Sequence, residues 1–219
     1  MQRMDNWSRG YAVLPGAADE LIGADGAMRP VWRQFLGRLA DLEPDDLERR
    51  FLAADRHIRD TGMSYRVHGE TREREWPLSR LPLLISAADW AEISAGVEQR
   101  ARLAEALLTD LYGEGRMLSD GVLPAAAIAG SGEFLPRLGG ARPPGGHWLR
   151  FFAVDIGRGP DGRWWILSDR TQAPSGAGYA LENRLAVAGS VQQILSEMNI
   201  ERLAGFFRDF RDGLSAAAE

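Results

Sequence analysis

The sequence contains no cysteine and no lysine. Without cysteine, disulfides, thiol catalysis and cysteine-based metal sites are excluded. All 26 basic residues are arginines, so chemistry that needs an ammonium group on a phosphate must use a guanidinium or come from outside this chain. The three histidines are isolated, with none at metal-binding spacing from another, so neither a zinc site nor a histidine-based triad is expected.

Long apolar runs are also missing. No stretch approaches the ~18 apolar residues that a membrane span needs, and the N-terminal MQRMDNWSRGY has no apolar core of a signal peptide. The net charge of -5 provides no basic excess to neutralise phosphates, which argues against a general nucleic-acid binder. We therefore expect a cytoplasmic protein with neither a membrane nor a nucleic acid as partner, and 219 residues suffice for one large or two small domains.

The first half of the chain predicts two helices after an irregular start. Residues 1–27 are rich in Gly and Ala and have no clear period, which is typical of an N-terminal arm. Apolar residues between 31 and 39 recur at helical spacing. A second helix is predicted to begin at Pro44, with acidic residues in its first turn, and to end at Gly62.

The middle of the chain predicts strands and one long helix. MSYRVHGE (63–70) alternates like a short strand, the charged residues 70–76 read as a solvated turn, and the apolar run RLPLLIS (80–86) reads as a buried strand. Apolar residues from Ile93 to Leu111 keep one helical face, and Gly113 ends it. The Gly- and Pro-rich residues 121–146 predict loops with short helical pieces.

The last third predicts a hairpin and two helices. HWLRFFAVDIGR and RWWILSD are strand patterns on either side of a GPDG turn, and apolar residues at 185–195 and 203–214 recur at helical spacing. The fold class predicted is mixed α+β, with an antiparallel hairpin at about 147–170 flanked by amphipathic helices. Three segments are predicted: the arm at 1–27, a helical α/β region at 28–140, and the hairpin with its following loop and helices at 141–219. The Phe-rich face of the last helix must bury against this chain or against a continuation of it.

Polar residues concentrate in the segment DRTQAPSGAGYALENR at 169–184, directly after the hairpin. Asp155 and Asp169 lie near strand ends, so their carboxylates could lie within about 10–15 Å of each other, depending on register. Mg²⁺ prefers such oxygen ligands. A Ser-Gly-x-Gly backbone ahead of a helix can present N–H groups to an anion. Together these features could form a nucleotide-phosphate site, although Asp and Gly are also ordinary turn residues.

Three stretches carry a resemblance to a known family. ADGAMRPVWRQFLGRLADLEPDDLERR, LLTDLYGEGRMLSDGVLP and RPPGGHWLRFFAVDIGRGPDGRWWILSDRTQAPSGAGYALENR together resemble circularly permuted type 2 ATP-grasp proteins similar to glutathionylspermidine synthase. The resemblance covers about residues 19–212. It implies an ATP-grasp-like partial domain and an ATP-dependent carboxylate–amine ligase that works through an acyl-phosphate.

The resemblance also implies roles for individual residues, with ATP and Mg²⁺ expected only in the intact protein. In this interpretation Arg150, Arg170 and Arg184 contact phosphate or a substrate carboxylate and count as catalytic. Ser175, Gly176 and Asn183 bind the cofactor. Asp155, Asp169 and Glu182 are the candidate metal ligands.

Two positions depart from the family pattern. An Asp on the first strand and a Glu and an Asn at the end of the second are the expected metal ligands; Asp155 matches the first, but Ser168 and Arg170 stand at the other two. A positive charge where Mg²⁺ would lie repels the metal. Either Arg170 neutralises phosphate directly, or this copy has lost the chemistry.

Two functions therefore stay open. The chain is expected to be the N-terminal portion of a ligase-like protein, inactive as a fragment, whose partners are the remainder of that protein with its nucleotide-binding lysines and small carboxylate and amine substrates. The alternative is a degenerate, non-catalytic ATP-grasp domain that serves as a protein-interaction or scaffold module.

Overall fold

The computed structural model describes residues 9–67, 69–172 and 174–218. The described residues form two compact units: the first takes the chain up to Ala87 with Gly157–Trp165 and Ser175–Leu203, and the second takes the rest. Each unit draws on more than one of the segments predicted from the sequence, and the division at residues 27 and 140 stays a prediction. Part of the expected arm (residues 1–8), His68 of the expected strand 63–70 and Ala173 of the polar segment lie outside the described residues.

The first unit begins with the two expected helices. Helix α2 (Pro30–Ala40) and helix α3 (Pro44–Asp60) both have proline in the first turn, where the missing N–H costs nothing. Asp45 and Asp46 follow at the positive end of α3. The chain leaves α3 through Gly62, whose φ of +67° suits glycine. Both predicted helices are confirmed.

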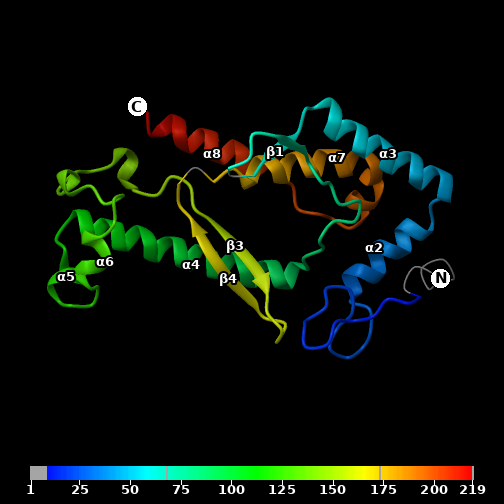
Figure 1. The fold of residues 1–219 in the computed structure, drawn as a ribbon, viewed down its shortest axis with the longest axis horizontal. Helices are drawn as coiled ribbons and strands as arrows, with labels where there is room; N and C mark the ends of the chain where they lie inside the picture. Colours follow the sequence, from blue (N-terminus) through cyan, green and yellow to red (C-terminus); the bar gives the residue numbers. More distant parts are fainter. Residues whose placement is uncertain (1–8, 68, 173, 219) are drawn as a thin grey trace. The chain divides into compact units, whose positions relative to one another are not determined.

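Helix α7 (Gly176–Glu197) completes the core of this unit and runs alongside α3 (Figure 1). Phe35 (1% exposed) and Leu39 of α2 pack with Val191 and Ile194 of α7 in one cluster. Ser190 links α7 to α3, because its hydroxyl donates to the Arg50 carbonyl oxygen at 2.7 Å. The Arg50 guanidinium donates to the Ser190 carbonyl oxygen at 3.0 Å in return.

Two sequence expectations in the first unit are wrong. Residues 80–86 form no strand, although Leu84 is buried in the core. Pro82 lacks the N–H that a sheet ladder needs, and none of the strands that the structure describes pairs with this run. Residues 73–75, expected as a turn, form β2 (Glu73–Glu75), which pairs antiparallel with β1 (Ser64–Arg66).

The second unit is built on α4 (Ala87–Tyr112), which confirms the predicted long helix. The expected short helical pieces follow as α5 (Arg116–Ser119), α6 (Ala125–Ala129) and two 3₁₀ turns (Pro136–Leu138 and Pro144–Gly146). Tyr112, the last residue of α4, packs against the residues that follow the helix: its ring centroid lies 4.4 Å from that of Trp148 and 5.1 Å from that of Phe134. No helix within the described ranges is long and apolar enough to cross a membrane.

The predicted hairpin is confirmed as β3 (Ala153–Arg158) and β4 (Trp164–Arg170), a two-stranded ribbon (Figure 1). Its turn closes where GPDG predicts, with the Gly162 N–H donating to the Gly159 carbonyl oxygen at 2.9 Å. Residues 147–152, expected as part of the first strand, are irregular. Mixed helix and strand, with a hairpin and amphipathic helices, is therefore the observed fold class.

Helix α8 (Ala204–Ala216) carries the Phe-rich face. Phe151 packs on it, with ring centroids 5.0 Å from Phe210 and 5.5 Å from Phe206. The face therefore packs in part on this chain, while Phe206 and Leu214 each keep more than two-fifths of their surface exposed.

Candidate functional site

Three side chains meet on one face of the hairpin. Ser168 and Arg170 are two residues apart on β4, so they project from the same face, towards Asp155 of β3. The Ser168 hydroxyl donates to Asp155 Oδ2, and Arg170 Nε donates to the same oxygen at 2.9 Å. Arg170 Nη2 lies 2.7 Å from that oxygen, in an ion pair. These hydrogen bonds, from Ser168 first and then from Arg170, lower the pKa of the Asp155 carboxyl.

Asp169 points to the opposite face of the hairpin, as the alternation of a strand requires. Its two carboxylate oxygens accept a bidentate pair from Arg100 of α4, with Nε at 2.6 Å and Nη2 at 2.8 Å. The hydrogen bond from Arg100 lowers the pKa of the Asp169 carboxyl. The structure thus places the two aspartates expected to share a metal on different faces, each bound by an arginine.

This hairpin does not fit a Mg²⁺ ion. Magnesium needs several oxygens that converge on one point, and the described part of the chain holds no group of three or more acidic or histidine side chains able to bind a metal. Asp155 and Arg170 are 47% and 61% exposed, so their pair is weak in energy. Because the Arg170 guanidinium is itself positively charged, it repels a cation that approaches Asp155.

Arg150 lies in the irregular segment before β3. Its guanidinium donates to the Pro144 carbonyl oxygen, and it lies against Gly145, whose φ of +66° favours glycine and where a Cβ would approach Arg150 Nη1 to 3.3 Å. Glu105 of α4 fixes this segment by accepting the backbone N–H groups of Trp148 and Leu149, each at 2.8 Å.

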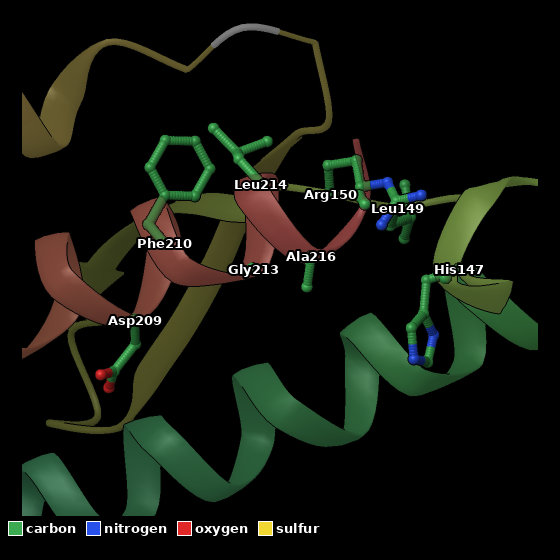
Figure 2. A pocket seen from close by; sticks show the side chains of 10 residues that line it. His147, Leu149, Arg150, Asp209, Phe210, Gly213, Leu214 and Ala216 are labelled. Carbon is green, nitrogen blue, oxygen red and sulfur yellow. The ribbon is translucent and has the colours of Figure 1, made fainter. Parts of the chain in front are cut away.

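Arg150 lines an open cavity of about 290 Å³ (Figure 2). Apolar and small residues of α8, including Phe210, Gly213 and Leu214, form one wall, and His147 lies on the other side. The predicted contact of Arg150 with phosphate or a substrate carboxylate stays a prediction.

In the first unit, Ser175 and Gly176 lie where α7 begins. The Ser175 carbonyl oxygen accepts the Gly178 N–H at 3.1 Å. The Ser175 side chain makes no capping hydrogen bond to the helix. The first N–H groups of a helix have no partner within it, so this position can donate to an anion. Contact between Ser175 or Gly176 and a phosphate stays a prediction.

Glu182, Asn183 and Arg184 lie on the next turns of α7, and each faces a group of the same unit. The Asn183 side-chain oxygen accepts the indole N–H of Trp76 at 2.6 Å, and Tyr179 stacks on that indole at 4.4 Å. Glu182 Oε2 lies 3.7 Å from His57 Nε2, and Arg184 donates to the Glu201 carbonyl oxygen at 2.9 Å. Their roles as metal, cofactor and catalytic residues stay predictions.

Three residues that matter to these positions were missed by the sequence reasoning. Arg100 binds Asp169 from 69 residues away, Trp76 binds Asn183 from 107, and Glu105 holds Trp148 from 43. Each stands in an ordinary helix or loop pattern, so no local signal in the sequence could have indicated the partner.

The profile of the family described as "Circularly permuted ATP-grasp type 2" matches residues 82–219. The chain is 36% identical over 215 residues to an uncharacterized protein of Mycobacterium tuberculosis. It is 34% identical over 207 residues to a Frankia alni protein named "Putative glutamate--cysteine ligase 2-3" and 33% identical over 204 residues to the "Putative glutamate--cysteine ligase 2-2" of Frankia casuarinae. Each alignment covers 93% of this chain but 24% of the relative, so the chain spans about a quarter of the length of these relatives.

Proposed function

This chain belongs to the circularly permuted type 2 ATP-grasp family, and from that premise we propose that it forms part of an ATP-dependent carboxylate–amine ligase of the glutathionylspermidine synthase-like kind. In such a reaction a substrate carboxylate oxygen attacks the γ-phosphorus of ATP, and ADP leaves. The amine nitrogen then attacks the acyl carbon of the acyl-phosphate, phosphate leaves, and the amine loses a proton.

The relatives' names and lengths support this proposal. Two of the relatives carry putative ligase names, and each is about four times as long as the region that matches this chain. The chain by itself is proposed to be inactive, because it has no lysine for the nucleotide phosphates and its hairpin does not fit Mg²⁺. Arg170 is proposed to neutralise phosphate directly in the longer protein.

One observation favours a second candidate, a non-catalytic domain. Asp155 is bound by Ser168 and Arg170 of the hairpin, and Asp169 by Arg100 of α4, so both carboxylates already have an arginine partner within this chain. A domain without ATP chemistry can keep such a hairpin for stability or for binding another protein. The two candidates differ in whether the longer polypeptide turns over ATP.

Release of ADP by a longer polypeptide that contains this chain distinguishes the two candidates. Glutamate and cysteine are the first carboxylate and amine to supply, since the named relatives suggest them. The ligase proposal predicts ADP release that requires both substrates and falls at least tenfold in Arg170→Gln, with Arg163→Gln in the hairpin turn as the matched control. Release that Arg170→Gln leaves unchanged removes Arg170 from the site, and no release with any substrate pair supports the non-catalytic candidate.

Thermal unfolding tests the isolated chain. A ligand that binds only the folded state raises the unfolding midpoint by mass action. We expect no shift with millimolar ATP and Mg²⁺. A rise in the midpoint would contradict the proposal that this chain alone is inactive towards nucleotide.

A further inference from the structure

The first unit contains a second cavity, which none of the residues predicted from the sequence lines. It has a volume of about 530 Å³ and lies between the C-terminal half of α3, the β1–β2 hairpin and the residues that follow β2. This volume is in the range of small-molecule sites in proteins, about 300–1,000 Å³.

Five charged residues line this cavity, and two of them, both exposed at the surface, have no partner among the described residues. Three are engaged with neighbours, in the pairs Asp55–Arg80 at 3.0 Å, Glu73–Arg66 at 3.0 Å and Arg74–Glu70 at 2.6 Å. The side chains of Arg59 and Glu75 have no hydrogen-bond or ion-pair partner among residues 9–67, 69–172 and 174–218. The cavity therefore offers one unengaged positive and one unengaged negative group.

The remaining lining is largely apolar and is held in place. Ile58 is 4% exposed, and Trp76 and Leu78 also line the cavity. Trp76 is fixed by three contacts: Tyr179 stacks on its indole, Tyr65 meets it edge-on at 6.0 Å, and Asn183 accepts its N–H. A fixed aromatic wall loses little conformational freedom when a ligand covers it.

We propose that this cavity binds a small zwitterion with an apolar part, such as an apolar α-amino acid or a dipeptide. Its ammonium group would meet Glu75, its carboxylate would meet Arg59, and its apolar side chain would cover Trp76 and Leu78. Guanidinium–carboxylate and ammonium–carboxylate contacts are charge-assisted hydrogen bonds, the strong kind. The inference rests on the cavity alone and is independent of the proposed ATP chemistry.

Binding of L-leucine and glycyl-L-leucine to the 219-residue chain tests the proposal, followed by saturation-transfer NMR and by titration calorimetry. Three analogues remove the charges in turn: N-acetyl-L-leucine lacks the ammonium, L-leucinamide lacks the carboxylate, and N-acetyl-L-leucinamide lacks both. We expect each loss of one charge to weaken binding about fivefold or more.

The variants Glu75→Gln and Arg59→Gln identify which protein group meets which charge. In Glu75→Gln, L-leucine and N-acetyl-L-leucine should bind equally; in Arg59→Gln, L-leucine and L-leucinamide should do so. Arg56→Gln on the same helix α3 and Glu92→Gln on α4 are the matched controls, because both residues are exposed and neither lines the cavity. Circular dichroism and the unfolding midpoint verify that all four variants fold.

The proposal is overturned if neither L-leucine nor glycyl-L-leucine binds at 10 mM, roughly the weakest affinity of interest. It is equally overturned if N-acetyl-L-leucinamide binds as well as L-leucine, which would show an apolar cavity without charge recognition. Binding that Glu75→Gln and Arg59→Gln leave unchanged would place the ligand elsewhere and would also refute it.

Discussion

Asn183 was expected from the sequence to bind a cofactor, and in the structure its side chain accepts the Trp76 indole N–H at 2.6 Å. We predict that Asn183→Ala lowers stability without any ligand present. The variant leaves a half-buried donor without its partner, which costs about 1–2 kcal/mol. Alanine is the better helix former by about 0.5 kcal/mol within α7, which offsets part of the loss.

The net loss expected for Asn183→Ala is therefore about 1 kcal/mol, or a fall in the unfolding midpoint of about 2–4 °C. Asn183→Asp keeps an oxygen acceptor and should stay within about 0.5 kcal/mol of the parent chain. Gln193→Ala is the control, because Gln193 is an exposed amide of the same helix whose bond to Glu197 contributes only a few tenths of a kcal/mol, roughly the helix propensity that alanine returns.

Urea unfolding followed by tryptophan fluorescence measures all three variants. Equal stability of Asn183→Ala and the parent chain would refute the structural role of Asn183. A loss in Asn183→Asp as large as that in Asn183→Ala would show that the acceptor oxygen is not what matters.

Three further predictions concern the core and the charges. Phe35→Ala, at a position 1% exposed, should lower the free energy of unfolding in urea by about 3–5 kcal/mol, and a loss under about 1 kcal/mol would contradict the core assignment. Ser190→Ala should lower it by about 1–2 kcal/mol, because the Arg50 carbonyl loses its buried donor; no loss would mean that water replaces the hydroxyl. The folded-state pKa of Asp169 lies below its ordinary value of 3.8, so the unfolded chain binds the proton more readily than the folded chain does. The stabilisation by Arg100 is therefore present above about pH 4, and it is lost as the pH falls through the lowered pKa. The midpoint difference between the parent chain and Arg100→Gln should therefore shrink between about pH 6 and pH 2, and a difference that grows on acidification would refute the assignment.

The helices could be predicted because their signals are local. Pro44 and Gly62 mark the two ends of α3, and the GPDG turn marks the hairpin, each through its own backbone preference. The strand predicted at residues 80–86 is wrong because an apolar run indicates burial but not pairing: Leu84 is buried, yet no strand among the described residues pairs with this run. Residues 73–75 were misjudged in the opposite way, because a strand whose residues are all exposed and charged has no alternation to detect.

The candidate site shows the same division. The alternation of β4 suffices to put Ser168 and Arg170 on one face and Asp169 on the other. Tertiary contacts between distant parts of the chain decide that Arg100 binds Asp169. They also decide that the Asn183 side-chain oxygen accepts the Trp76 indole N–H. Polar residues that are close together in the sequence predict a possible site. They do not show whether the carboxylates bind one metal together or each pair with a different arginine.

The most direct test of the account is whether the hairpin binds a divalent cation. Mn²⁺, a paramagnetic substitute for Mg²⁺, is titrated into the 219-residue chain and into the double variant Ser168→Glu/Arg170→Asn, and the free ion is followed by electron paramagnetic resonance. Because Arg170 opposes a cation beside Asp155, we predict no Mn²⁺ bound to the parent chain at the hairpin and a gain of binding in the double variant that Asp155→Asn removes. Binding of Mn²⁺ to the parent chain that Asp155→Asn abolishes would contradict the account.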